Sequence, residues 1–517
     1  MKHKHLYILL LVTLVVLAVV SFYYKTVFGS FSIESFKVMS RPATIDPDYT
    51  DIVVPPNIAP LNFSIKETGK EFFVRIYADK GNEIKIVSKK SKIIIPLEKW
   101  HQLLNANRGG KLSFDVYVKD EQNNWNKYQT ITNYIAEEQI DPYMVYRVIN
   151  PVFYTLHSVS VYERHLEDYD ESIVFDGDSF VNGCANCHTF LNNSPDKMFL
   201  GVRSDDYGAA TLLKTGRKID KIGTTFTYTA WHPSGKLAVY STNRISQFFH
   251  TARPETRDVA DLDSAILYYM VDAKVVATNS VLADANQLET CPTWSPDGKY
   301  LYFCRAPITW TSRLNAPPDG YEKIRYDLMR ISYDVDKDQW GRLETVLSAE
   351  QTKKTILSPR ISPDGRFLLF CMCDHSCFPL YQQDSDLYMM DLKTGEYNKL
   401  DINSDYPESW HSWSSNGRWI VFSSKRQGTL FTRTYISYFD KSAKPHKPFI
   451  LPQKDPAFYD SYIKSHNLPE LITGPVDVGS RELAVAVRSS NEIKVLLPIT
   501  GATPKQGRAV QEYIPRE

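Results

Sequence analysis

The chain has 517 residues, more than one ordinary domain holds, so the sequence predicts two or three domains. Hydrophobic residues make up 43% and charged residues 23%, a balance typical of globular proteins, which argues against a disordered chain. Sixty Lys and Arg residues balance sixty Asp and Glu residues, so no global positive field exists to attract nucleic acid. Aromatic residues reach 13% and 29 prolines interrupt the sequence, which favours short strands and turns over long helices.

Residues 1–30 have the features of a membrane-directing segment. Lys2 and Lys4 precede an uncharged run at 6–24, and Lys25 follows it. A run of this length can span a bilayer with its basic flank in the cytoplasm. Residues 27–29 offer an alternative cleavage site, whereas the lack of any Cys before residue 184 excludes a lipoprotein anchor. Either alternative predicts a periplasmic protein, anchored to the inner membrane by its N-terminus or released by cleavage.

Residues 51–130 are expected to form a small β-sandwich, fibronectin-like, that acts in spacing or docking. Short strand-like runs separated by polar turns support this expectation, at residues 61–66, 72–78, 83–87 and 111–118. Residues 131–175 are expected to be a connecting segment, partly helical, that leads into the main body. No residue of the expected β-sandwich points to chemistry.

An internal repeat predicts the fold of the main body. Trp231-His-Pro-Ser-Gly-Lys recurs as Trp294-Ser-Pro-Asp-Gly-Lys, as Ile361-Ser-Pro-Asp-Gly-Arg and as Trp413-Ser-Ser-Asn-Gly-Arg, and Asn193-Ser-Pro-Asp-Lys is a degenerate copy. Gly after Asp, Asn or Ser supplies the positive φ of a tight turn, and an apolar strand follows each copy. Four strands per repeat, arranged radially, make a propeller blade.

Five copies are visible, and residues 482–487 are expected to pair with residues upstream of 184 to complete a sixth blade. The predicted chain is therefore all-β. A six-bladed β-propeller occupies residues 176–500 and a C-terminal tail occupies 501–517.

These repeats resemble the TolB-like propeller family, with its PD40 or WD40-like W-S-P-D-G-K signature, over about residues 185–500. The order of segments is also similar to that of Bacteroidetes-type TolB-like proteins. Asp141-Pro-Tyr-Met-Val-Tyr-Arg is followed by a C-x-x-C-H motif, by the repeats, and by Leu451-Pro-Gln-Lys-Asp-Pro-Ala-Phe-Tyr-Asp. Such proteins are often labelled cytochrome c biosynthesis proteins. The resemblance implies a propeller and a link to cytochrome c assembly, for which no residue pattern of this chain argues.

The motif Cys184-Ala-Asn-Cys187-His188 predicts one covalent haem c. Two thiols at this spacing add to the two vinyl groups of haem, and the adjacent His188 binds the iron as the proximal ligand. A redox dithiol would need a βαβ context, and a zinc site would need a second ligand pair, neither of which the sequence contains. A simple disulfide between Cys184 and Cys187 is the remaining alternative.

The sequence leaves the second axial ligand of the haem open. His188 and His411 both fall near the start of an innermost strand, and loops on the same face of the propeller carry His250 and His375. In order of preference, the distal position is expected to be open or water-bound, then to be filled by His411 or His250, and last by Met198. Met198 comes last because it begins a strand and is expected in the core.

The sequence leaves open whether the other five cysteines form disulfides. The hairpin around Asp297-Gly298 brings Cys291 and Cys304 near enough for a disulfide, unless a four-residue turn shifts the register. For the cluster Cys371, Cys373 and Cys377, disulfides or buried thiols come first and a metal site is the second alternative.

Two functional classes follow. The first is an extracytoplasmic monohaem c protein in electron transfer or haem-based sensing, with an envelope or redox protein as partner. The second is a haem-free TolB-like scaffold for protein–protein interaction in the envelope. No catalytic residue is assigned: no G-x-S-x-G nucleophile elbow occurs, which disfavours a hydrolase, while haem-dependent redox activity is left open.

Overall fold

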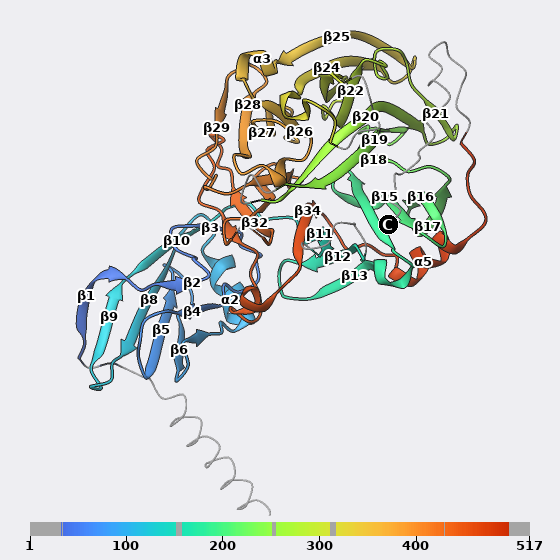
Figure 1. Ribbon diagram of the computed structural model, residues 1–517. Helices are drawn as coiled ribbons and strands as arrows, with labels where there is room; N and C mark the ends of the chain where they lie inside the picture. Colours follow the sequence, from blue (N-terminus) through green and yellow to red (C-terminus); the bar gives the residue numbers. More distant parts are fainter. Residues whose placement is uncertain are drawn as a thin grey trace, which may run out of the picture.

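The structure, a computed structural model, describes residues 33, 35–150, 158–250, 255–310, 317–428 and 430–495. The expected membrane segment at 1–30 and the expected tail at 501–517 lie outside the described residues. Among the described residues, no helix combines the length and the apolar character needed to cross a membrane. The described chain forms an N-terminal β domain and a larger β-propeller, which Figure 1 shows as a blue and a green-to-orange body.

The N-terminal domain contains one seven-stranded and one three-stranded sheet. The larger sheet is formed by β1 (Lys37–Pro42), β3 (Val53–Val54), β5 (Glu71–Tyr77), β6 (Ile84–Ser88), β8 (Lys111–Lys119), β9 (Trp125–Gln129) and β10 (Ile131–Ile135). The smaller sheet is formed by β2 (Ile45–Asp46), β4 (Phe63–Ile65) and β7 (Lys92–Ile93). The four runs read from the sequence correspond to β4, β5, β6 and β8.

This domain departs from the expected fibronectin-like sandwich at 51–130 in three respects. The pairs β1–β9 and β3–β10 are parallel. A helix, α2 (Leu97–Ala106), follows Pro96 and buries Trp100, Leu103 and Leu104. Their helical spacing gives α2 one apolar stripe, which the sequence reading overlooked. The domain also extends to residue 135, because β10 pairs with β8 and β3.

The propeller consists of six four-stranded sheets, called blades 1 to 6 in order around the axis. Blade 1 is β14 (Cys184–Leu191), β15 (Ser194–Ser204), β16 (Gly208–Thr215) and β17 (Lys218–Ile222), and blade 2 is β18 (Thr227–Trp231), β19 (Leu237–Phe249), β20 (Arg257–Met270) and β21 (Val275–Ala277). Blade 3 is β22 (Gln287–Trp294), β23 (Tyr300–Pro307), β24 (Asp327–Asp334) and β25 (Gln339–Leu347). Blade 4 is β26 (Thr355–Ile361), β27 (Phe367–Cys373), β28 (Asp386–Asp391) and β29 (Tyr397–Lys399), and blade 5 is β30 (Glu408–Trp413), β31 (Trp419–Ser424), β32 (Arg433–Tyr438) and β33 (Phe449–Ile450).

Blade 6 closes the ring by joining distant parts of the chain. Its innermost strand is β34 (Ser465–Ile472), and its outer strands β11 (Tyr143–Ile149), β12 (Ser160–His165) and β13 (Glu171–Phe175) precede the other blades in sequence. Figure 1 shows the red β34 beside the teal β11. Each innermost strand contacts the next, and β34 contacts both β30 and β14, so the innermost strands form a closed ring around an axis.

Two sequence expectations are corrected by blade 6. Within the expected connector at 131–175, Tyr143–Ile149, Ser160–His165 and Glu171–Phe175 are strands of a blade, and none of its described residues is helical. Residues 482–487 do not complete the sixth blade, because they lie in a helix, α5 (Ser480–Arg488). Its buried residues Leu483, Ala484 and Val487 have helical spacing and pack in the apolar core shared by blades 1 and 6.

The repeated turns have the predicted geometry in blades 2 to 5. Gly235, Gly298, Gly365 and Gly417 have φ of 69, 72, 74 and 66°. Blade 1 differs: Asn192 and Asn193 both have positive φ, and Leu191 pairs with Ser194, so the turn lies before the Ser-Pro-Asp segment. The degenerate copy is therefore a two-residue hairpin turn at Asn192-Asn193.

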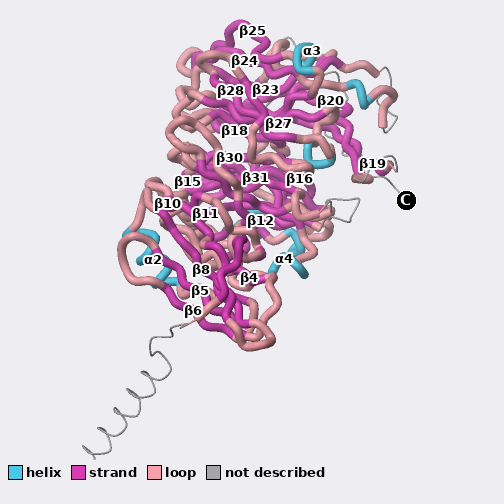
Figure 2. The backbone as a smooth tube through the Cα atoms, turned by 90° about the vertical axis from the view of Figure 1, so that its left-hand side faces the viewer, coloured by secondary structure: helices cyan, strands magenta, loops and turns pink. Residues whose placement is uncertain are grey.

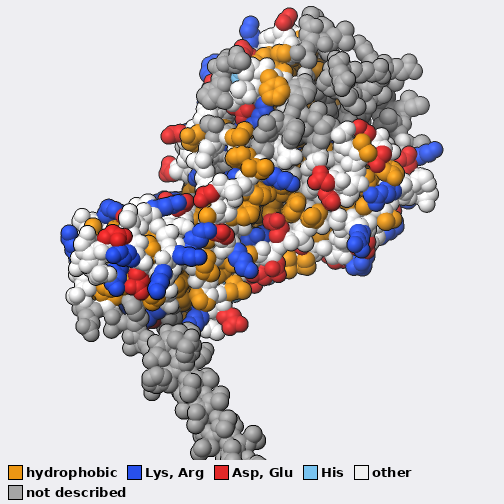
Figure 3. Space-filling view, turned by 60° about the horizontal axis from the view of Figure 1, so that its bottom comes forward, with side chains coloured by type: hydrophobic (Ala, Val, Ile, Leu, Met, Phe, Trp, Pro, Cys, Tyr) orange, Lys and Arg blue, Asp and Glu red, His pale blue; other side chains and the backbone are white. Residues whose placement is uncertain are grey.

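Polar contacts hold the segment between the two bodies against the blade 5 turn. The Asp141 carboxylate accepts hydrogen bonds from the Ser415 main-chain N–H at 2.7 Å and from its hydroxyl at 2.5 Å. Asn416 donates to the Gln139 carbonyl at 2.7 Å. One apolar core also runs from the N-terminal sheets into blades 4 and 5, and the side view shows the propeller standing directly on the N-terminal domain (Figure 2). Basic and acidic side chains are interspersed over the face shown in Figure 3.

Candidate functional site on the propeller axis

The C-x-x-C-H motif lies on β14, the innermost strand of blade 1. Cys184 pairs with Arg203 of β15, and His188 pairs with Leu200. The register shifts between Ala185 and His188, so the middle of the motif is a bulge in the ladder. Cys184 is fully buried, at the end of the propeller where the innermost strands begin. We call this end the entry face.

His188 is buried between blades 1 and 6 without a hydrogen-bond partner. Its side chain is 7% exposed, and neither ring nitrogen reaches hydrogen-bond geometry with any described residue. The ring lies beside the main chain of Val145 and Leu468 of blade 6. Burial, with the nearby Arg147 charge, lowers the pKa of His188 to about 3, so the imidazole is neutral and can act as a ligand. Buried polar groups are nearly always paired, so this imidazole needs an explanation.

The two motif thiols are close enough to interact electrostatically. Burial raises the pKa of Cys184, and the Arg203 and Arg147 charges oppose that rise. Burial also raises the pKa of Cys187, again opposed by Arg147. Arg147, on β11 of blade 6, is thus the cation common to both thiols and His188. Two thiols beside one neutral, unpaired imidazole are the donor set that haem c requires.

Bulges recur in the innermost strands of blades 2 to 6. At each register shift one residue has positive φ, although none is Gly: Tyr228 (43°), Cys291 (53°), Ser358 (54°), Trp410 (51°) and Leu468 (48°). Left-handed backbone costs such residues on the order of 1–3 kcal/mol each, and such strain concentrates at functional sites. Each of these residues stands three positions before a large apolar residue at or next to the end of its innermost strand, at 231, 294, 361, 413 and 471.

The bulge side chains of opposite blades meet on the axis. In a ring of six, blades 2 and 5 face each other, and the Tyr228 and Trp410 rings lie 5.9 Å apart between centroids and nearly parallel, at 12°. Phe378 from the blade 4 loop contacts Trp410 at 5.4 Å. An aromatic pair of this kind contributes about 0.5–1.5 kcal/mol beyond burial. The axis is therefore closed by side chains next to Cys187, whose thiol lies near the Tyr228 main chain.

A long hairpin from blade 2 reaches over the entry face. β18 pairs with β19 only up to Ser241, and β19 and β20 continue as a pair to Phe249 and Arg257. Asp258 on this extension accepts hydrogen bonds from Ser376 at 3.2 Å and Gln382 at 3.0 Å, both in the blade 4 loop. The extension thus crosses from blade 2 to blade 4.

A buried charge cluster fastens the same hairpin to blade 5. Glu255 pairs with Lys425, and its carboxylate accepts from the Arg257 guanidinium at 2.7 and 2.8 Å. Burial lowers the pKa of Lys425 to about 8. Although burial opposes it, the Arg257 hydrogen bond and the Lys425 charge lower the pKa of Glu255 to about 2. Tyr381 receives both cations on its ring face, at 4.7 Å from Arg257 and 5.5 Å from Lys425.

Both ring nitrogens of His411 lie beside groups of blade 4. Its Nε2 is 3.1 Å from the Leu369 carbonyl oxygen and its Nδ1 is 3.7 Å from the Cys371 sulfur. Burial lowers the pKa of His411 to about 3. No described contact joins His411 to His188, so His411 as the distal ligand stays a prediction.

The remaining distal candidates are placed as follows. His250 lies at the end of the hairpin extension, and its Nδ1 is buried without a partner, but no described contact joins it to His188. His375 is buried, with Nε2 3.7 Å from Asp258. Met198 is fully buried in the core of blades 1 and 6, as expected for a core residue. His250 therefore stays a prediction, and the open position remains the first choice.

The other cysteines lie close to the axis without disulfides. No disulfide joins any cysteine of the described chain. The cross-strand partner of Cys304 is Thr290, because the bulge displaces Cys291 by one residue. A hydrogen bond from the Cys304 thiol lowers the pKa of Cys291. Cys371, Cys373 and Cys377 are buried, and within the described ranges no three His, Cys, Asp or Glu side chains are grouped to hold a metal ion.

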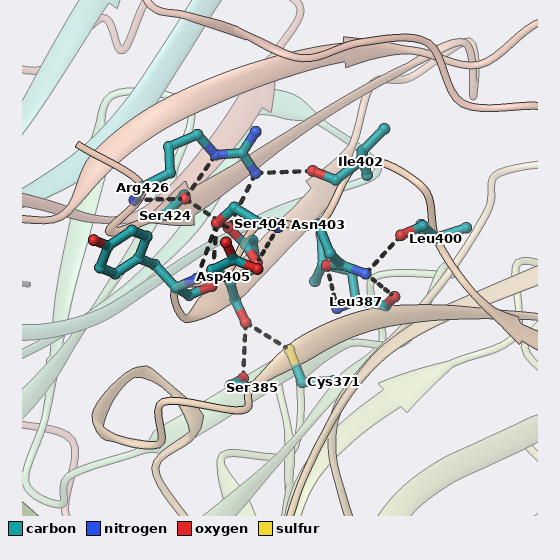
Figure 4. A network of polar contacts seen from close by, with 12 residues as sticks. Cys371, Ser385, Leu387, Leu400, Ile402, Asn403, Ser404, Asp405, Ser424 and Arg426 are labelled. Carbon is teal, nitrogen blue, oxygen red and sulfur yellow. Dashed lines mark hydrogen bonds and ion pairs between the residues drawn. The ribbon is translucent and has the colours of Figure 1, made fainter. Parts of the chain in front are cut away.

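A second polar network supports the innermost strand of blade 5 (Figure 4). Glu408, fully buried at the start of β30, accepts hydrogen bonds from Ser404 at 2.6 Å, Ser424 at 2.8 Å and Arg426 at 3.0 Å. Figure 4 shows Arg426 directed also at Ile402, whose carbonyl it reaches at 2.9 Å. This carboxylate has its full set of partners, so it stabilises the entry face rather than offering a reactive group.

Comparison with known proteins adds fold-level likeness only. The solved structures that resemble the chain include an auxiliary nutrient binding protein from Bacteroides thetaiotaomicron (10% identity, TM-score 0.33, covering 79% of this chain and 99% of that one). A second is the Cps50 (Swd1) β-propeller domain of Myceliophteria thermophila, with 12% identity and a TM-score of 0.29, covering 49% of this chain and 64% of that one. A third is prolyl oligopeptidase B of Galerina marginata, with 10% identity and a TM-score of 0.30, covering 78% of this chain and 62% of that one. With TM-scores this low, the β-propeller is established here by strand order.

No protein-family model matches the chain. One curated relative, the uncharacterized protein Atu1656 of Agrobacterium fabrum, is 28% identical over 171 residues, which are 28% of this chain and 53% of that protein. The chain thus spans about half the length of the curated relative it matches.

Sequence reasoning found the motif residues but missed Arg147, Tyr228 and Trp410. The signal for the last two was present, since both stand three residues before a repeat Trp. Arg147 carries no such signal, because only ring closure brings β11 beside blade 1.

Proposed function

We propose that the chain is an extracytoplasmic monohaem c protein of the TolB-like, six-bladed propeller type, acting in electron transfer or haem-based sensing at the cell envelope. Cys184 and Cys187 would hold the haem covalently, and His188 would bind its iron. The observation that carries the proposal is the buried His188 imidazole, which has no hydrogen-bond partner among the described residues although it directly follows a C-x-x-C pair. When bound, haem supplies one-electron chemistry at iron.

The residues around the motif have defined roles in this proposal. The Arg147 charge next to His188 disfavours imidazolium, which keeps a ring nitrogen free to bind iron. A positive charge near a bound haem disfavours the ferric state relative to the ferrous state, so Arg147 would raise the reduction potential. The hairpin extension held by Glu255 and Lys425 would limit access of water to the entry face.

The first test is a haem stain. The chain, co-expressed with a cytochrome c maturation system, should keep haem after boiling and denaturing electrophoresis. Cys184→Ser with Cys187→Ser should abolish the stain, whereas Cys291→Ser with Cys304→Ser should leave it unchanged. An unstained wild-type protein, alongside a matured control cytochrome, would reject the proposal.

The alternative function is a haem-free TolB-like envelope scaffold. The fully buried Cys184 and the closed axis at Tyr228 and Trp410 favour it, because a packed motif can serve stability alone. It predicts a colourless protein whose stability, and not its spectrum, changes when Cys184 and Cys187 are replaced. The N-terminal membrane attachment is common to both proposals and is tested by membrane fractionation of chains with and without residues 1–30.

A further inference from the structure

Five strands of the N-terminal domain begin or end at the place where the described chain enters it. Strand pairing runs in one row across β6, β5, β8, β9 and β1, through Ser88, Phe72, Val118, Asn126 and Lys37. At the usual spacing of paired strands, this row is about 19 Å wide. We call the row, with the adjoining residues 36, 70–71, 89–90 and 119–125, the N-terminal rim. Figures 1 and 2 show the N-terminal domain at the bottom of the molecule, with the propeller above it.

The N-terminal rim carries five lysines whose side chains reach solvent: Lys37, Lys70, Lys89, Lys90 and Lys119. Lys70 pairs with Glu121 at 3.2 Å, and Lys119 pairs with Glu71 at 3.3 Å. Lys37, Lys89 and Lys90 have no ion-pair partner among the described residues. The rim therefore presents three uncommitted ammonium groups. Figure 3, in which the bottom of the molecule comes forward, shows basic side chains across the N-terminal domain.

The carboxylates of the rim do not balance its lysines. Two of the three, Glu71 and Glu121, are the ion-pair partners just described. The third, Asp120, accepts hydrogen bonds from the main-chain N–H groups of Gln122 at 3.0 Å and Asn124 at 2.8 Å in the turn between β8 and β9. Five lysines thus face three carboxylates, and the net charge of the rim is positive.

Aromatic rings stand beside these lysines. Phe36, 42% exposed, packs edge-on against Tyr117, with ring centroids 5.6 Å apart. The Lys127 ammonium lies 5.7 Å from the Phe36 ring centre and 5.5 Å from that of Tyr117. The Lys119 ammonium lies 5.5 Å from the Trp125 ring centre. Aromatic rings together with lysines whose stems lie along apolar surface are typical of protein surfaces at the headgroup layer of a bilayer.

The connection from the rim to the predicted membrane segment is short. Only residues 25–35 separate the uncharged run at 6–24 from Phe36. A connection of this length reaches at most about 40 Å when fully extended, and about half of that as a flexible coil. With the run in a bilayer, the rim would be held close to the surface, so that even weak contacts would act at a high effective concentration.

We propose that the N-terminal rim docks on an anionic bilayer surface, with Lys37, Lys89 and Lys90 against the lipid phosphates and Phe36 in the headgroup layer. The docking rests on the proposed membrane attachment through residues 1–30. Each lysine close to such a surface strengthens binding about fivefold. One apolar core runs from the N-terminal sheets into blades 4 and 5, so docking of the rim would also fix the height and orientation of the propeller above the bilayer.

The test uses the full chain in vesicles of phosphatidylcholine, either alone or with an equal amount of phosphatidylglycerol. Lysines are acetylated with a water-soluble reagent, and the rate at each lysine is measured by peptide mass spectrometry. Lys89 and Lys90 should react at least about fivefold more slowly in the anionic vesicles, whereas the exposed Lys393 of blade 4 should react equally in both. High salt should remove the difference, because it screens exposed charges.

Two variants with the same change of charge isolate the rim. Lys89→Gln with Lys90→Gln should weaken docking by more than about tenfold, and so abolish the protection of Lys119, which stays in the rim. Lys393→Gln with Lys441→Gln removes two exposed lysines of the propeller instead and should leave that protection unchanged. Thermal melts check that both variants fold, and the salt dependence of the unmodified chain tests the docking without any substitution.

Each result decides the inference. Flotation with vesicles of phosphatidylcholine alone measures the attachment itself. A chain that floats with them, but whose rim lysines react equally in both lipids, keeps the attachment and overturns the docking. A chain that does not float overturns both. Equal protection of Lys119 in the rim variant and the propeller variant also overturns the docking. The haem stain is read separately, so the haem proposal is decided on its own result.

Discussion

Blades 2 to 5 and blade 6 reach the same four-stranded shape by different routes. Blades 2 to 5 are contiguous in sequence and carry the Gly turn, whereas blade 6 combines β34 with β11–β13, which lie some three hundred residues earlier. Yet β34 has the same central pattern, since Leu468-Pro469-Glu470-Leu471 parallels Ser358-Pro359-Arg360-Ile361, with positive φ at the first residue of both. The innermost strand, rather than the turn after it, is therefore the shared unit of a blade.

The largest effect is expected from removing β34. A chain that ends at Lys464 leaves β11 without its inner partner and blades 5 and 1 without a neighbour. The loss exceeds the roughly 5–15 kcal/mol that stabilises a typical domain, so the propeller should not fold cooperatively. Circular dichroism melts measure this. A chain that ends at Gly479 keeps β34 and should retain a cooperative transition, and if both truncations melt alike, β34 does not close the ring.

The second-largest effect is a difference in stability loss between a buried carboxylate on an innermost strand and an exposed ion pair on outer strands. Glu408→Gln leaves Arg426 without its carboxylate partner at a fully buried position, so urea unfolding should show a loss of about 3 kcal/mol. Glu344→Gln breaks the exposed Arg330–Glu344 pair on the outer strands of blade 3 and should cost less than about 1 kcal/mol. Equal losses would show that the buried network does not hold the innermost strand.

The third effect is a dependence of stability on pH that arises from Glu470 in blade 6. Burial raises the pKa of Glu470 to about 7, so the folded state holds this proton at a higher pH than the unfolded state does. Stability therefore falls as pH rises from the ordinary Glu range to about 7, and stays reduced above it. Glu470→Gln removes that cost and still accepts the Phe190 N–H, so it should gain about 2 kcal/mol at pH 8.

The gain from Glu470→Gln should disappear at pH 4, where the carboxyl is protonated in both states. Arg360→Gln serves as the control, since it removes the cation that opposes the raised pKa and should destabilise the protein most above pH 7. A Glu470→Gln gain that is independent of pH would contradict the assignment.

The smallest effect tests the strained bulges. Ser358→Gly relieves a left-handed serine and should stabilise the protein by up to about 1 kcal/mol in urea unfolding. Ser409→Gly, in the corresponding strand of blade 5 but outside the positive-φ set, should instead lose stability. If both substitutions destabilise, the bulges are not strained.

The sequence allowed blades 2 to 5 to be predicted because Trp231, Trp294, Ile361 and Trp413 precede a turn that only a positive φ can make. The sixth blade was misplaced because Ile472-Thr473-Gly474 breaks that signature after β34, while the apolar residues Leu483, Ala484 and Val487 were read as a strand. A local sequence pattern indicates a strand or a helix, but it does not indicate which other element that strand or helix contacts. Ring closure over a long separation depends on packing, which no local pattern encodes.

The candidate site was predicted in the same partial way. Cys184, Cys187 and His188 stand together in sequence, so their chemistry could be read directly. Strand position does not say which neighbouring blade a side chain faces, so the contacts of His411 with Cys371 and Leu369 could not be read from the sequence. Arg147 and the Tyr228–Trp410 contact depend on blades meeting across the ring, and so became visible only in three dimensions.

The most direct test of the account is the intact mass of the purified chain, matured with a cytochrome c assembly system and denatured before analysis. Covalent attachment at Cys184 and Cys187 predicts one added haem, which disappears when both residues are serine. A mass equal to that of the bare polypeptide would contradict haem c, and the unpaired imidazole of His188 would then need another partner.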